Sequence, residues 1–137
     1  MSDAAFNLQT ALYSALTGST AVTGAGSTGT VNVYDHVPQN SSFPYIAIGE
    51  ALDADWSSKT YDGQRHAVTL HIWSRYRGAK EIKQITSAVH TLLHNSNLSV
   101  TSHGLTLLQF DNAQYMTEAD SMTRHGVIRY TALTHES

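Results

Sequence analysis

Histidine is the residue type best supplied for chemistry, since the chain holds eight histidines and no cysteine. His90 and His94 lie four residues apart in a stretch with helical periodicity, a spacing at which two imidazoles can share a metal ion. The segment between them lacks the glutamate of the zinc-protease motif, and spacing places no third ligand. His66 and His71 differ in parity along a predicted strand and therefore point to opposite faces. We expect no metal site here, and we expect these histidines to be polar residues of the surface or of an interface.

Other catalytic patterns are missing or lie in the wrong context. The lack of cysteine excludes disulfides, thiolate metal sites, iron–sulfur clusters and a cysteine nucleophile, and no G-x-S-x-G nucleophile motif occurs. The segment 24–29 matches G-x-G-x-x-G, but no strand precedes it and a strand rather than a helix follows. Asp53, Asp55 and Asp62 lack the ligand pattern of a calcium loop. We therefore expect neither an enzyme nor a cofactor, and a small histidine-dependent metalloenzyme is kept as a remote alternative.

The composition favours a protein that packs against other proteins. The 137 residues carry a formal net charge of −3, and only 14% of them are charged, against about 25% in a typical domain. Fifteen serines and sixteen threonines supply much of the polar surface, and neutral hydroxyl surface opposes association less than charge does. The negative balance argues against a surface for nucleic acid. The length predicts one domain, residues 1–137. The sequence contains no secretion signal and no apolar run of the roughly 20 residues that a membrane span needs. We therefore expect a protein made inside the cell.

Hydrophobic periodicity indicates the elements that position these residues. Apolar residues every three to four positions predict helices, and alternation of apolar and polar residues predicts strands. Helices are expected at 3–16 and 77–94, and strands at 31–34, 43–50, 64–74, 98–102, 105–111 and 125–134. This order predicts an α+β fold, a mostly antiparallel β-sheet with two α-helices packed on one face. The strand at 64–74 is largely apolar on both faces, so we expect it to be central.

Three segments between these elements are expected to be loops. Residues 18–30 are rich in glycine, serine and threonine and predict a flexible connector, or else an arm that becomes ordered against a neighbouring subunit. Residues 51–63 and 112–124 are long and polar and contain aromatic residues. Near the start of the second helix, Lys80 and Glu81 are expected to face water.

Four short motifs follow one another along the chain. They are Ala11-Leu12-Tyr13-Ser14-Ala15-Leu16, Val33-Tyr34-Asp35, Phe43-Pro44-Tyr45-Ile46-Ala47-Ile48-Gly49, and Val68-Thr69-Leu70-His71-Ile72-Trp73-Ser74-Arg75 followed by Gly78. Together they resemble the small tail-terminator (tail-completion) proteins of long-tailed bacteriophages, prophages and phage-like gene transfer agents. The resemblance spans about residues 5–133, and the long segment 18–30 is its main departure.

The resemblance implies a structural role in particle assembly. Such proteins form a hexameric ring on the last ring of tail-tube subunits, stop growth of the tube and present a surface for head joining. The implied partners are other copies of the chain, the tail-tube protein and the head–tail connector or stopper protein. DNA passes through the ring lumen without specific binding, and no membrane, cofactor or enzymatic activity is implied. The protein would be made in the bacterial cytoplasm and incorporated at the head-proximal end of the tail. A connector or stopper of the same particle is the nearest alternative.

On this interpretation the two long polar loops dock against partners, because aromatic residues dominate the energetics of many interfaces. Arginines after the central strand and before the last strand are expected to pair with acids of a neighbouring subunit, which is how unlike surfaces close a ring. The alternatives are that these charges are ordinary surface residues and that Trp56 and Tyr61 pack within their own subunit. The expected interface residues are Asp53, Asp55, Trp56, Tyr61, Asp62, Arg75, Arg77, Tyr115, Met116 and Arg124.

Overall fold

A computed structural model describes residues 4–27, 29–57, 59, 62–94, 98, 100 and 103–136. Within this part of the chain the elements are α1 (Ala4–Gly18), α2 (Thr20–Thr23), β1 (Asn32–Tyr34), β2 (Tyr45–Asp55), β3 (Gly63–Ser74), α3 (Lys80–Leu93), β4 (His103–Thr117) and β5 (Arg124–Glu136). The strands form one sheet in the order β1-β2-β3-β5-β4. Only β1 and β2 are parallel; the other neighbours are antiparallel. The predicted α+β class and the central position of β3 are confirmed.

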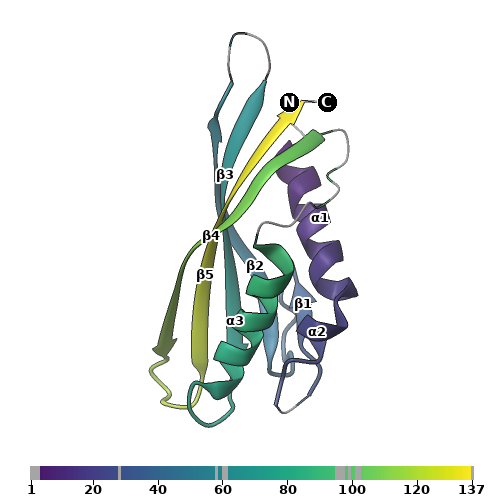
Figure 1. Cartoon of the computed structure of the whole chain (residues 1–137). Coiled ribbons are helices and arrows are strands. Elements are labelled where there is room, and N and C mark those ends of the chain that lie inside the picture. The colour runs from purple at the N-terminus through teal and green to yellow at the C-terminus, as the bar shows by residue number, and fades with distance from the viewer. Residues whose placement is uncertain are drawn as a thin grey trace.

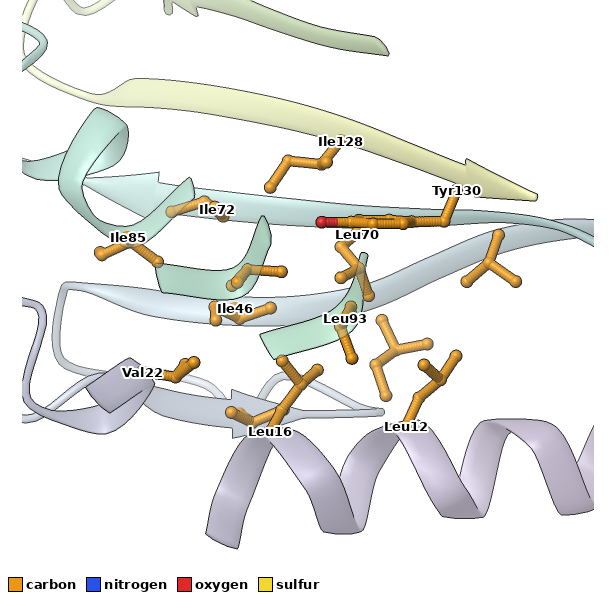
Figure 2. Packing of buried hydrophobic residues seen from close by; sticks show 14 of the residues in the cluster. Leu12, Leu16, Val22, Ile46, Leu70, Ile72, Ile85, Leu93, Ile128 and Tyr130 are labelled. Atoms are coloured by element: carbon orange, nitrogen blue, oxygen red, sulfur yellow. The ribbon is translucent and has the colours of Figure 1, made fainter. Parts of the chain in front are cut away.

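The helices α1 and α3 cover the same face of the sheet (Figure 1). Figure 2 shows Leu12 and Leu16 of α1 and Leu93 of α3 gathered over the strand residues Ile46 and Leu70. The apolar stripe predicted for the long helix is largely buried, because every third or fourth side chain of a helix lies on one face. No helix of the described residues covers the other face of the sheet (Figure 1).

The segment 18–30, expected to be a loop throughout, contains a short helix at residues 20–23. These residues form α2, whose first turn is capped because the Ser19 hydroxyl accepts from the Val22 N–H. Val22 and Val31 are both buried in the core. Burial of these two apolar residues holds the glycine-rich segment against the core. The described residues therefore contain three helices rather than the two predicted.

About half of the two long polar segments, 51–63 and 112–124, is strand rather than loop. β2 continues to Asp55 and β4 to Thr117, so that only residues 56–62 and 118–123 connect strands. Polar residues are stable in these extensions because neighbouring strands complete their backbone hydrogen bonds, which hydrophobicity does not reveal. The strand expected at 98–102 is left undecided, since residues 99, 101 and 102 lie outside the described part and Val100 forms a single bridge with His103.

Tyr130 is a buried core residue whose ring and hydroxyl contribute differently to stability. Its ring packs edge-on against Phe110 at 5.8 Å between centroids, and among the described residues its buried hydroxyl has no hydrogen-bond partner. Burial raises the pKa of Tyr130 above its ordinary value. Because an unpaired buried hydroxyl costs free energy, Tyr130→Phe is expected to leave the free energy of unfolding unchanged or raise it by up to about 1 kcal/mol. Urea denaturation checks this, with Tyr130→Ala as the control that loses about 3 kcal/mol or more; a comparable loss in the phenylalanine variant would contradict the packing described.

Candidate functional site

The residues expected at an interface fall into two groups at opposite ends of the sheet. Asp53 and Asp55 close β2, and Trp56 and Asp62 lie in the connection to β3. This acidic end (Asp53, Asp55, Trp56 and Asp62) forms a hairpin that reaches beyond the helices at the top of Figure 1. Tyr61, the remaining member of this group, lies outside the described residues.

Trp56 is only partly held by its own subunit. Its backbone N–H donates to the Gly63 carbonyl at 2.9 Å, and its ring lies so close to Gly63 that a Cβ there would meet the ring at 3.1 Å. The residue is nevertheless 39% exposed. An aromatic side chain that is fixed on one side and open on the other has the character of an interface anchor.

The second group gathers at the other end of the sheet, where β3 and β4 end and β5 begins. Its members come from the end of β4, the start of β5 and the loop after β3, and we call them the basic end: Arg75, Arg77, Tyr115, Met116 and Arg124. The arginines line an open hollow of about 740 Å³ together with Tyr76, Lys80, Ser121 and Met122. Four cationic side chains around one hollow favour an anionic or carboxylate-rich partner.

Local contacts fix the geometry of this basic end. The Arg75 guanidinium lies 4.5 Å from the centre of the Phe43 ring, and its Nε donates to the Thr123 hydroxyl at 3.1 Å. Hydrogen bonds from the backbone N–H groups of Thr123 and Met122 hold the pKa of Asp120 at about 2. The loop 118–123 is therefore tied down by an ionised carboxylate, and Arg75 is positioned beside it.

The two ends are separated by the length of β3. A strand rises about 3.3 Å per residue, so the 12 residues of β3 place the acidic and basic ends roughly 40 Å apart. Copies standing side by side at one height therefore do not bring Arg124 next to Asp53. The expected pairing between them requires copies displaced along the strands by about that length.

His66 is buried, which corrects the expectation that it is a surface or interface residue. It is 0% exposed, and its Nδ1 lies 2.6 Å from Asp53 Oδ1 and its Nε2 2.9 Å from Thr134 Oγ1. An Asp–His–Thr series has the connectivity of a nucleophilic triad. Thr134 is only 1% exposed, so its hydroxyl cannot meet a substrate. The arrangement instead ties β2, β3 and β5 together at the acidic end and occupies Asp53.

The uncovered face of the sheet carries a row of four ionisable residues in contact with one another. His71 Nε2 lies 2.9 Å from Glu50 Oε1, His71 Nδ1 lies 2.7 Å from His125 Nε2, and His125 Nδ1 lies 3.4 Å from Glu118 Oε2. Trp73 stacks on His125 with 3.8 Å between ring centroids. We call these the imidazole row: Glu50, His71, His125 and Glu118. The row joins β2, β3 and β5 to the loop after β4.

Gly49 makes room for this row. A Cβ at Gly49 would come within 2.5 Å of the His71 ring, so only glycine allows the imidazole to lie across β2. Sequence periodicity placed His71 and Trp73 on one face of the strand and gave no sign that His125 and two glutamates meet them there.

The number of ring hydrogens limits the bonds of the imidazole row. Two neutral rings carry two N–H hydrogens for three contacts, and the longest contact, His125 to Glu118, is the one left without a hydrogen. With a hydrogen on every ring nitrogen, two N–H groups would face each other across the 2.7 Å contact between His71 and His125.

Acid is expected to destabilise the folded chain through this row. Desolvation by burial and then the charge of His71 lower the pKa of His125 below its ordinary 6.5, while the pKa of Glu50 is lowered by its hydrogen bond to His71. A histidine with a depressed pKa binds fewer protons folded than unfolded, so its contribution is present above about pH 6.5 and lost as the pH falls. Urea denaturation from pH 8 to 5 should show a shallower pH dependence in His125→Gln than in the parent chain, with His36→Gln as the exposed control. Equal slopes in all three would contradict this assignment.

The pair His90 and His94 supports β4. The two rings stack at 4.7 Å between centroids, His94 Nδ1 accepts from the Phe110 N–H at 3.2 Å, and His90 packs edge-on against the Phe110 ring. No group of three or more histidine, aspartate and glutamate side chains in the described part is arranged to hold a metal ion. The helices described are too short or too polar to cross a membrane.

Glu81 is the residue that sequence reasoning misplaced most. It was expected to face water, yet it is fully buried at the start of α3. Its carboxylate accepts from the Ser27 backbone N–H at 2.7 Å and from the Ser74 hydroxyl at 2.5 Å. Glu81 thereby joins the segment 18–30 to the end of β3, directly beside the basic end. An acidic residue in the first turn of a helix was the available signal, because the helix dipole favours it there.

Comparison with known proteins gives a consistent result. A family model described as "Tail completion protein gp17" matches residues 10–135. The "Tail completion protein gp17" of Bacillus phage SPP1 is 25% identical over 91 residues, which is 66% of this chain and 67% of that protein. Among solved structures, a chain of the "Virion of native gene transfer agent (GTA) particle" superposes with a TM-score of 0.87 at 25% identity and covers 96% of this chain and 97% of that one.

Proposed function

The chain belongs to the tail completion protein gp17 family, whose model spans residues 10–135, and from this premise we propose that it is a tail terminator. Copies of the chain form a ring of six on the last ring of tube subunits, at the head-proximal end of a phage or gene-transfer-agent tail. The ring stops polymerisation of the tube and offers its other side to the head connector. The observation that carries this proposal is the structural likeness over 96% of the chain to a chain of a gene transfer agent virion.

The two chemically different ends fit a terminator. A tube grows because each added ring offers the next ring the same upper surface, so a protein that ends growth must match the tube on its lower side and lack that surface on its upper side. Here one end is acidic with the half-exposed Trp56, and the other is basic with Arg75, Arg77 and Arg124. Because β3 separates the ends, we propose that each contacts a neighbour along the tail axis rather than the adjacent copy. DNA passes through the ring without specific binding, and the chain acts as a structural protein, not an enzyme.

The function is tested by tube growth in solution. Purified tail-tube protein of the same particle is polymerised alone and with increasing amounts of this chain. Tube length measured by electron microscopy is expected to fall as the chain is added, with additional density at one tube end. Tubes of unchanged length at a saturating excess of the chain would contradict the terminator proposal.

The two ends are tested by Trp56→Ala and Arg124→Ala. Each removes an anchor at one end, and loss of such an anchor weakens an interface by about 2 kcal/mol, or roughly thirtyfold in affinity. Particle assembly is expected to fall by at least tenfold in each variant, while Ser87→Ala on the exposed side of α3 assembles as the parent chain does. If both variants assemble normally, the assignment of the ends as docking surfaces is wrong.

A further inference from the structure

Two edges of the sheet lack a partner strand among the described residues. β1 pairs only with Tyr45–Ala47 of β2, so the rest of β2, through Asp55, has no strand beside it on that side. At the opposite side of the sheet β4 is the last strand, and no strand pairs with its outer edge. Unpaired edges are the usual sites at which a sheet takes up a further strand.

The free edge of β2 is bordered by apolar surface on both faces. On the helix-covered face, a hollow of about 280 Å³ lies beside the edge, and its lining includes Leu8, Leu12, Ile48, Ala51 and Val68. Phe6 at the rim of this hollow is 70% exposed, and Leu52 on the other face of β2 is also 70% exposed. A strand laid along this edge gains backbone hydrogen bonds and buries apolar side chains on both faces, which is how strand addition achieves affinity.

The edge of β4 carries few of the features that normally block such pairing. Natural edges are protected by charged residues, especially lysine, by proline and by β-bulges. β4 contains neither lysine nor proline, and Asp111 is its only acidic residue. Register shifts interrupt its pairing with β5 at Leu105/Leu107 and Phe110/Asn112, and the Phe110 N–H already donates to His94, so the residues from Leu107 to Gln109 form the regular part of this edge.

The two free edges lie at the same height and run in opposite directions. Leu52 pairs with Ala67, Ala67 with Thr131, and Thr131 with Gln109, so Leu52 and Gln109 share one row on the uncovered face. Each step from β2 through β3 and β5 to β4 is antiparallel, which makes β4 opposite in direction to β2. A second copy turned about an axis parallel to the strands therefore presents its β4 antiparallel to the free edge of β2, with helix-covered faces continuous.

From this match we propose that the subunits of the ring are joined by strand addition, with the Leu105–Asn112 stretch of β4 in one copy pairing with the Gly49–Asp55 stretch of β2 in the next. β1 limits the pairing to these rows, because it occupies the edge beside Tyr45–Ala47. Phe110 of the second copy, which is level with Ala51, then lies beside the hollow under Phe6. The contact joins two different surfaces and therefore repeats until a ring closes. This inference rests on the proposed ring-forming function and specifies its subunit contact.

Engineered cysteines test the pairing, since the chain has no cysteine of its own. Leu52→Cys combined with Gln109→Cys is expected to give, on oxidation, a ladder of covalent oligomers beyond the dimer that a reductant abolishes. Each single variant should stop at dimers at most. Leu52→Cys with Ser87→Cys is the matched control, because Ser87 is exposed on α3 away from both edges.

The outcomes separate this inference from the function on which it rests. Pairs of Leu52→Cys with Leu107→Cys or Asn112→Cys cover shifted registers on the same face, and all pairs are also oxidised in assembled particles. Rings or particles that form without a ladder in any pair would overturn the strand-addition contact while leaving the terminator function standing. If the unmodified chain fails to limit the length of the tubes, that result would instead contradict the terminator function alone.

Charge placed on the two edges gives a second measurement. Both side chains are exposed, so Leu52→Lys with Gln109→Lys should leave the folded subunit intact and weaken ring formation at least tenfold through repulsion across the seam. Leu52→Lys with Gln109→Glu should restore ring formation. Association of the double-lysine variant at the same concentration as the parent chain, measured by native mass spectrometry, would overturn the proposal.

Discussion

Glu81→Ala is expected to lower the free energy of unfolding by about 3 kcal/mol. The carboxylate is buried and accepts from the Ser27 N–H and the Ser74 hydroxyl, so its removal leaves two donors without their acceptor and a small void. The effect should extend beyond stability, because Glu81 holds the segment 18–30 against α3 next to the basic end.

Urea denaturation of a matched pair checks this prediction. Gln84→Ala removes the amide oxygen that accepts from the hydroxyl of the same Ser27, but that bond is exposed and its loss should cost less than about 1 kcal/mol. Glu81→Gln keeps one acceptor oxygen and should fall between the two. If the alanine variants at 81 and 84 lose the same free energy, the buried carboxylate does not stabilise the fold in the way described.

His66→Ala is expected to cost about 3 kcal/mol as well. The change opens a cavity between strands and leaves the Asp53 carboxylate and the buried Thr134 hydroxyl without the ring that bonds both. In a chain of 137 residues a loss of this size corresponds to a fall in Tm of roughly 10 °C.

The control for His66 is His36→Ala, which lies exposed in the turn after β1 and should change stability by less than about 0.5 kcal/mol. Thermal unfolding followed by circular dichroism compares the two. A Tm for His66→Ala within 2 °C of the control would show that His66 is not the buried link between β2, β3 and β5 described above, since about 1 kcal/mol already shifts Tm by several degrees.

Hydrophobic periodicity predicted the elements that pack against the core. The stripe through Ile82, Ile85 and Val89 and the alternation of Val68, Leu70 and Ile72 record which side each residue buries, and both were interpreted correctly. It did not predict the outer halves of β2 and β4. Those segments are polar because the strands there pair at the ends of the sheet, and backbone pairing leaves no mark in side-chain hydrophobicity.

The polar contacts were beyond sequence reasoning for a related physical reason. Glu81 and His66 are charged or polar residues whose burial is compensated by partners far away in the sequence, such as Ser27 and Thr134. Only the fold brings those partners together, so composition and spacing assigned both residues to the surface. The positions of the expected interface residues at the two ends of the sheet could not be foreseen. Their segments were predicted as loops, and the sequence does not show which strands pair there or in which register.

The proposed role of this chain is to end the growth of a tail tube. Electron microscopy of lysates from a producing strain that lacks the chain tests this role, with tail length and head attachment scored in the same images and the restored gene as the control. Tails that grow beyond the normal length and carry no heads are expected. Tails of normal length lying apart from filled heads, or intact particles, would contradict it.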